Sequence, residues 1–370
     1  MLSSLPKLAD KAFILGFFMP VLLFLVGVLA LFSDTKPLAD LLAKAGGEGG
    51  VEKLSYAVLL VWSIAVLMML ANHTLFRLLE GYLPPISCWS WLRAREQRRY
   101  EALRKREETQ LAEGRALRAR YDLAQLLEDH DRVAALEPVL AKARIAHDST
   151  LIELNVGFPS NPQWLMPTRF GNALRAFETY STAVYGADGV PIWLRLASVV
   201  PSAYQAAMED ARAQVNFLVN IVYFSLLLAV LSACRAVWEI RWPGLTMSTP
   251  FIDLAWMFGH ARPAFFLPVP AFVLLAWGAY GFSVSRVQAW GELVRSAFDC
   301  YLPDLAKRLG YDLPKKRDDQ VRFWEDVSRR AIYGTPFKPE DWSQASAGEG
   351  AAGADAPENS SADEDAASSD

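Results

Sequence analysis

Four long apolar runs constrain this chain more than any other feature. They cover residues 12–32, 56–76, 215–234 and 264–284, and they hold a large share of the 52% of residues that are hydrophobic. A helix of roughly 20 apolar residues crosses a bilayer core about 30 Å thick. We therefore expect an all-α membrane protein with four transmembrane helices in two pairs.

Prolines and glycines in and beside these runs predict where the helices bend or end. Pro20 lies near the middle of the first run, where it predicts a kink. Gly81 and Pro84-Pro85 predict a firm end to the helix that contains the second run. The fourth run begins with several prolines, so we expect irregular first turns there. Residues 251–258 are too short to span and are expected to lie on the outer surface.

A polar domain at residues 83–212 separates the two pairs of runs. Near its start, residues 93–106 contain seven basic residues and only two acidic ones. Basic residues close to a span stay on the cytoplasmic side. This pattern predicts a cytoplasmic domain, both termini in the cytoplasm, and a plasma-membrane location. Anionic lipid headgroups or a protein partner are the expected contacts, while nucleic acid is not expected because no stacking aromatics interleave with the run. The seven residues are Arg93, Arg95, Arg98, Arg99, Arg104, Lys105 and Arg106.

The remaining organisation follows from composition. Residues 92–146 predict a charged helical hairpin with a turn at 128–131, and residues 156–201 mix prolines with aromatics, which predicts short packed helices. Residues 287–342 predict two cytoplasmic amphipathic helices after the second membrane pair at 213–286. Residues 343–370 carry acids without a basic residue, so we expect a disordered acidic tail.

Sites for chemistry are sparse in this sequence. The cysteines at positions 88, 234 and 300 form no disulfide framework or paired metal motif, although Cys88 could be palmitoylated. The turn Glu128-Asp129-His130-Asp131 is interpreted as solvated, because adjacent helical residues point apart. HExxH, GxSxG, Walker and Rossmann patterns are absent, so we expect no enzyme, metal or cofactor. Arg169, Arg175, Glu178 and Arg195 could hold an anion, but pairing with each other and with helix ends is favoured.

Several short motifs together resemble a family of uncharacterised bacterial multi-pass inner-membrane proteins with a cytoplasmic helical domain. They are residues 13–20, 77–82 and 167–172, followed by Tyr185-Gly186 and by residues 301–305 with Trp324-Glu325. The resemblance implies no catalytic residue. Within it, the segment at 167–175 is interpreted as a packing motif, carried by Pro167, Arg169, Gly171, Asn172 and Arg175.

Two hypotheses for function follow. The first is a non-enzymatic membrane protein whose cytoplasmic helical domain engages a protein partner or self-associates. The second is a small oligomeric transporter or channel. Transport sites usually place ionisable groups at membrane depth, whereas these runs offer amides such as Asn216 and Asn220, so the first hypothesis is favoured.

Overall fold

The computed structural model describes residues 10–32, 50–238 and 268–334 of the chain. The segment 33–49 between the first two apolar runs, the predicted surface segment at 251–258 and the predicted acidic tail at 343–370 lie outside the described residues. All regular structure in the described residues is helical, and four of the helices are long and apolar enough to cross a membrane. Contacts divide the chain into two units, residues 1–180 with 200–296 and residues 181–199 with 297–370.

Four helices in the first unit correspond to the four apolar runs. The first run forms α1 (Lys11–Phe13), a π-helix η2 (Ile14–Phe18) and α2 (Met19–Phe32). The irregularity expected at Pro20 therefore takes the form of a π-helical turn just before it. The second run lies in α4 (Gly50–Glu80), which ends before Gly81 as predicted.

The helices that contain the third and fourth apolar runs continue well beyond those runs. The third run lies in α10 (Ser202–Trp238), where the polar segment before it continues into the span without a break. The fourth lies in α12 (Pro268–Arg308), which also contains the amphipathic segment predicted as a separate helix. No glycine or proline between residues 284 and 290 interrupts the backbone hydrogen bonds, so the two predicted elements form one helix.

The spans bury aromatic and small side chains against one another and leave large apolar ones outside. Phe17 and Val21 pack near Ala65 of α4, and Phe24 stacks on Phe224 at 4.6 Å between ring centroids. Leu59, Leu70, Leu274 and Trp277 are exposed on the outer surface. Helices that are apolar on all sides are typical of a lipid environment.

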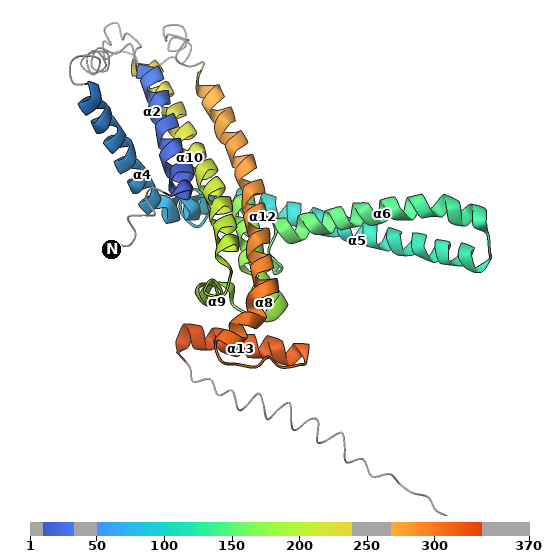
Figure 1. The fold of residues 1–370 in the computed structure, drawn as a ribbon. Coiled ribbons are helices and arrows are strands. Elements are labelled where there is room, and N and C mark those ends of the chain that lie inside the picture. The colour runs from blue at the N-terminus through green and yellow to red at the C-terminus, as the bar shows by residue number, and fades with distance from the viewer. Residues whose placement is uncertain (1–9, 33–49, 239–267, 335–370) are drawn as a thin grey trace, which may run out of the picture. The chain divides into compact units, whose positions relative to one another are not determined.

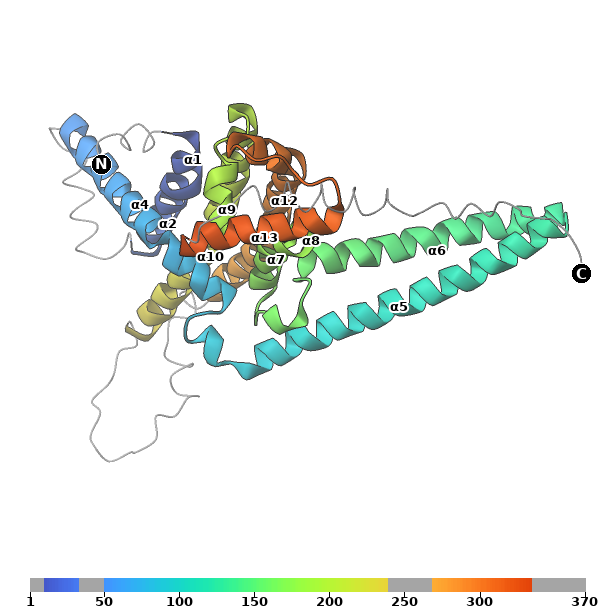
Figure 2. The ribbon, with the colours of Figure 1, turned by 90° about the horizontal axis from the view of Figure 1, so that it is seen from below.

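Two long charged helices of the first unit pack against each other as a hairpin, which we call the arm (Figures 1 and 2). They are α5 (Ser90–Leu126) and α6 (His130–Gly157). Within this unit, both views show the arm running crosswise to the apolar helices. Asp129 caps α6 by accepting a hydrogen bond from the backbone of Arg132 at 3.1 Å. The second helix continues about three turns beyond the predicted end at residue 146, because no breaker intervenes and Leu154 packs into a cluster with Phe158.

Short elements connect the arm to the spans. They are η3 (Ile86–Cys88) before the arm and η4 (Pro162–Trp164) and α7 (Arg169–Glu178) after it. Seven of the ten residues of α7 are buried, and α7 contacts both α4 and α6. Gly291 of α12 lies so close to α7 that a Cβ there would come within 2.5 Å of the Phe177 ring.

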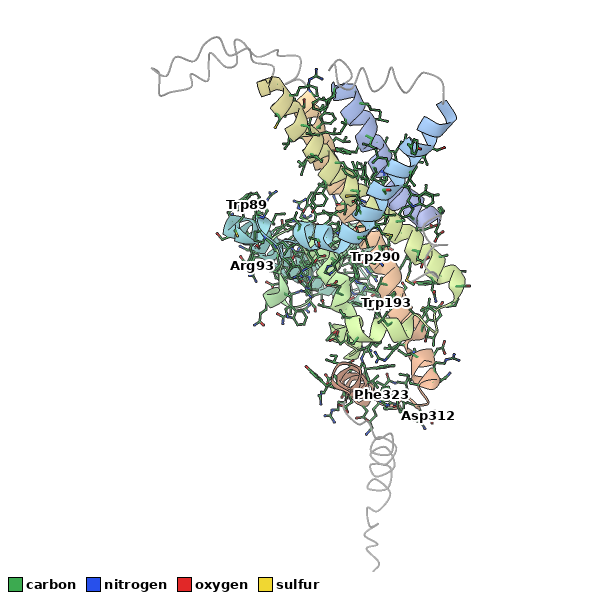
Figure 3. The ribbon with its side chains drawn as sticks, turned by 90° about the vertical axis from the view of Figure 1, so that its left-hand side faces the viewer. Trp89, Arg93, Trp193, Trp290, Asp312 and Phe323 are labelled. Carbon is green, nitrogen blue, oxygen red and sulfur yellow. The ribbon has the colours of Figure 1, made fainter. Side chains whose placement is uncertain are left out.

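The second unit has a small helical core of its own. It holds α8 (Tyr180–Tyr185) from residue 181 on, α9 (Gly189–Leu196), the last turns of α12 and α13 (Arg317–Tyr333). Figure 3 labels Trp193 and Phe323, which lie on α9 and α13. Ile192, Leu305 and Phe323 are almost completely buried. Residues 181–199, which the sequence pattern places within the domain 83–212, thus group with the C-terminal helices.

Candidate functional site

The start of α7 is joined to the end of α4 by a single threonine. The Thr168 hydroxyl accepts a hydrogen bond from the Gly171 backbone N–H at 2.9 Å and so caps α7. The same hydroxyl donates towards the backbone carbonyls of Leu79, at 2.8 Å, and Glu80, at 3.1 Å. The last carbonyls of a helix have no intrahelical partner, so one side chain serves both helix ends.

Two glycines allow the backbones to meet at this point. A Cβ on Gly171 would lie 2.5 Å from the carbonyl oxygen of Glu80. Gly81 has a φ of +95°, and a Cβ there would lie 2.2 Å from the Pro167 ring. Side chains other than hydrogen do not fit at either position.

Asn172 connects this turn to the arm. Its side chain is completely buried, with Oδ1 accepting from the Met166 N–H at 2.7 Å and Nδ2 donating to the Met166 carbonyl at 3.1 Å. Nδ2 also lies 3.4 Å from a carboxylate oxygen of Glu96 on α5. A buried amide with three partners fixes the relative position of the segments it joins.

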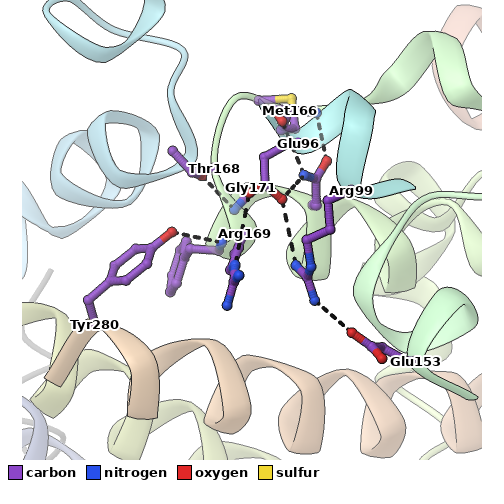
Figure 4. Close-up of polar contacts among 10 residues, drawn as sticks. Glu96, Arg99, Glu153, Met166, Thr168, Arg169, Gly171 and Tyr280 are labelled. Atoms are coloured by element: carbon purple, nitrogen blue, oxygen red, sulfur yellow. Dashed lines mark hydrogen bonds and ion pairs between the residues drawn. The ribbon is translucent and has the colours of Figure 1, made fainter. Parts of the chain in front are cut away.

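Glu96 is a buried carboxylate at the base of the arm, surrounded by cations (Figure 4). Its oxygens lie 3.7 Å from Arg99 and 3.9 Å from Arg169. Arg99 also pairs with Glu153 of α6 at 2.9 Å and lies over the Phe158 ring. On the other side, the Phe170 N–H donates to the Tyr280 hydroxyl of α12 at 3.4 Å. We call Glu96, Thr168, Gly171 and Asn172 with the end of α4 the α7 junction.

A second charged group lies beside the α7 junction. The guanidinium groups of Arg77 and Arg175 both lie over the Tyr82 ring, 5.5 and 5.7 Å from its centroid, and Arg175 donates to the Tyr82 hydroxyl. Arg175 also lies 3.6 Å from Glu178. Burial raises the pKa of the Glu178 carboxyl, and the nearby Arg175 charge opposes that rise.

These contacts show where the site residues predicted from the sequence lie. Pro167, Gly171 and Asn172 meet at the α7 junction, Arg169 reaches its carboxylate, and Arg175 lies beside it. Arg195 belongs to the other unit and donates to the Pro191 carbonyl at 2.7 Å. The polar side chains of the junction contact one another and the backbone, and these contacts hold the ends of α4, α5 and α7 together.

Sequence reasoning missed Glu96 and Thr168. Glu96 is an acid within a basic run, which is a sign of a paired buried carboxylate. Thr168, just before a helical segment with glycine three residues on, is a recognisable capping residue.

The basic run divides into two groups on α5. Arg99 and Arg104 make ion pairs with acids of the arm. For the other five, the described part of the chain provides no carboxylate within ion-pair distance, and all five are exposed. These are Arg93, Arg95, Arg98, Lys105 and Arg106.

The amides of the spans bond neighbouring helices. Asn72 of α4 donates to the Oδ1 of Asn216 at 3.3 Å. Asn220 donates to the backbone carbonyl of Gly16 at 2.7 Å. That carbonyl lacks its usual α-helical donor, because the residue four positions later is Pro20, which has no N–H. The amide of Asn220 therefore satisfies a backbone group left open by a proline.

Within the described residues, no group of three or more His, Cys, Asp or Glu side chains is placed to hold a metal ion. Comparison with protein families, curated proteins and solved structures finds no match. In the residues that the structure describes, all regular structure is helical and four helices are long and apolar enough to cross a membrane.

Proposed function

We propose that this chain is a non-enzymatic, multi-pass inner-membrane protein whose arm mediates protein interaction or self-association. In this arrangement two helix pairs flank a cytoplasmic helical domain, and both termini are cytoplasmic. The basic residues that follow α4 support this orientation, since positive charges near a span stay on the cytoplasmic side.

One observation carries the proposal: large apolar side chains are exposed on an otherwise charged arm. Ile145 and Ile152 are 69% and 62% exposed, and they lie seven residues apart on one face of α6. Near the tip, Leu126 is 82% exposed and Leu127 is 64% exposed. Apolar groups grouped on a polar surface are typical of interaction sites.

The test changes the apolar face and leaves the rest of the arm intact. Ile145→Glu with Ile152→Glu is expected to reduce the mass of the detergent-solubilised complex or remove its cross-linked partners, because charge opposes burial at an interface. The control is Ala135→Glu with Arg144→Gln, which changes the net charge equally at exposed positions about a quarter turn away from Ile145 and Ile152. Identical assemblies from both variants and the unaltered protein would contradict the proposal.

A truncation gives an independent test. Replacing residues 111–143 with a short Gly-Ser turn removes the distal arm and keeps Glu96, Arg99 and Glu153, so the α7 junction is retained. Partners bound through Leu126 and Leu127 at the tip should be lost and those bound through Ile145 and Ile152 kept, while the protein still inserts into the membrane. Partners that survive both this truncation and the double change Ile145→Glu with Ile152→Glu would place the interaction outside the arm.

A further inference from the structure

The five unpaired cations of the basic run are arranged by the geometry of α5. Arg95, Arg98 and Lys105 follow Trp91 at intervals of four, three and seven residues, so they recur on one side of the helix. Arg106 borders the same side. We call Trp91, Arg95, Arg98, Lys105 and Arg106 the basic face.

The opposite side of α5 is the one that packs. Glu96 and Glu107 are buried, and Leu103 packs against the cluster of Leu154 and Phe158. Positions two apart on a helix differ by about 200°, which separates Arg98 from Glu96 and Lys105 from Leu103. The basic face is consequently turned away from α6 and is free for an external partner.

The α7 junction holds this face close to the membrane. Thr168 binds the last carbonyls of α4, and Asn172 of the same turn contacts Glu96 in the second turn of α5. The base of the arm is therefore tied to the end of a span. Figure 3 shows Trp89 and Arg93 together at this base.

Two exposed tryptophans at the base of the arm suit the membrane–water interface. Trp89 and Trp91 are 46% and 57% exposed, and their rings stack at 6.4 Å between centroids. Exposed tryptophans beside a span are typical of the membrane–water interface. Basic residues next to tryptophans at this interface lie at the level of the lipid headgroups.

We propose that the basic face binds the anionic phospholipid headgroups of the membrane that α4 enters. Each basic residue near an acidic leaflet strengthens attraction roughly fivefold, so four cations act as a substantial anchor. The face has no exposed aromatic between Arg95 and Arg106, because Tyr100 packs on Phe158 at 5.5 Å, and this favours lipid over single-stranded nucleic acid. Lipid contact through α5 leaves Ile145 and Ile152 of α6 for the protein partner proposed above, and the two proposals fail independently.

The experiment measures how close the basic face lies to lipid headgroups. The three native cysteines are replaced by serine, and Ala102→Cys, an exposed position within the face, carries a fluorophore. The full chain is placed in nanodiscs that contain a headgroup-linked quencher. Quenching is expected to be several-fold greater with phosphatidylglycerol present than with phosphatidylcholine alone, and 1 M salt should remove much of the difference.

Two charge variants decide where the effect arises. Arg95→Gln, Arg98→Gln, Lys105→Gln and Arg106→Gln together should abolish the dependence on anionic lipid. The control neutralises four exposed cations farther along the arm and should keep it, and circular dichroism checks that both variants retain their helices. Equal quenching in both lipids, an equal loss in the control, or a response to added RNA alone would overturn the proposal. The control positions are Arg115, Arg120, Lys142 and Arg144.

Discussion

At the scale of single residues, two glycines differ in the room that their surroundings leave for a larger side chain. Gly171 faces the Glu80 carbonyl, which is backbone and cannot move aside easily, whereas a Cβ added at Gly114, in the interior of α5, would meet no atom within 4 Å. The same substitution should therefore have opposite effects at the two positions.

Gly171→Ala is expected to destabilise the protein by about 1–3 kcal/mol, because the added methyl group forces helices apart. Gly114→Ala should stabilise it by about 0.5–1 kcal/mol, since alanine restricts the unfolded chain and fits the helix. Denaturation in detergent, followed by circular dichroism, measures both. A neutral Gly171→Ala would contradict the close approach at the α7 junction.

Asn220 gives a second prediction at this scale. Asn220→Leu should cost about 1 kcal/mol, because the Gly16 carbonyl then lacks a donor in an apolar surrounding. In a Pro20→Ala background the cost should shrink, since the introduced alanine has a backbone N–H that can serve the same carbonyl. Unfolding free energies of the four proteins form a double-mutant cycle, and equal costs in both backgrounds would disprove the link.

The raised pKa of Glu178 predicts that the stability of the protein depends on pH. Its pKa is raised in the folded protein by burial, so the folded state favours the protonated carboxyl. Its contribution to stability is greatest below the unfolded pKa and is lost as pH rises through the folded value. Glu178→Gln should therefore gain stability relative to the unaltered protein as pH rises above 4.5. A pH series of melting temperatures checks this, and a constant difference would argue against the raised pKa.

At the scale of elements, the arm is connected to the spans through few side chains. Glu96 contacts Asn172 and lies near Arg99 and Arg169, while beyond this base α5 packs mainly on α6. The distal arm should therefore respond little to changes at the α7 junction.

Glu96→Ala is expected to raise hydrogen exchange in the first turns of α5 and at the start of α7, because the buried Asn172 and the more exposed Arg99 and Arg169 lose the carboxylate they contact. Exchange in the spans should stay unchanged. Glu113→Ala, at an exposed position of the same helix, provides the control. Equal exchange in both variants would mean that Glu96 does not hold the base of the arm.

The elements also show which parts of the fold are predictable from sequence. The spans and the end of α4 at Gly81 follow from local pattern, since apolar length and glycine act within a few residues. The change in hydropathy after the fourth run predicts a boundary there, but no breaker residue lies at that point and the helix continues. The length of α6 is not predictable in the same way, because the cluster of Leu154 and Phe158 is completed by Tyr100 and Leu103 of the other arm helix.

The candidate site was partly predictable for the same reason. Pro167, Gly171 and Asn172 form a conspicuous turn, but their partners lie about 75 to 90 residues away at Glu96 and the end of α4. The pairing of α9 with α13 in the second unit is likewise long-range. A single sequence offers no signal for which distant segments meet.

At the scale of the whole molecule, the central claim is that four helices cross a membrane and leave the arm in the cytoplasm. The four helices and the basic run support it through their length and their charge. The partner binding proposed for the arm and the lipid binding proposed for its basic face both depend on this arrangement.

Cysteine labelling tests the claim most directly. In a cysteine-free protein, Lys36→Cys lies between the first two apolar runs and Leu126→Cys lies at the arm tip. A membrane-impermeant maleimide should label Lys36→Cys in intact cells and Leu126→Cys only after permeabilisation. Labelling of Leu126→Cys from outside intact cells would contradict the account.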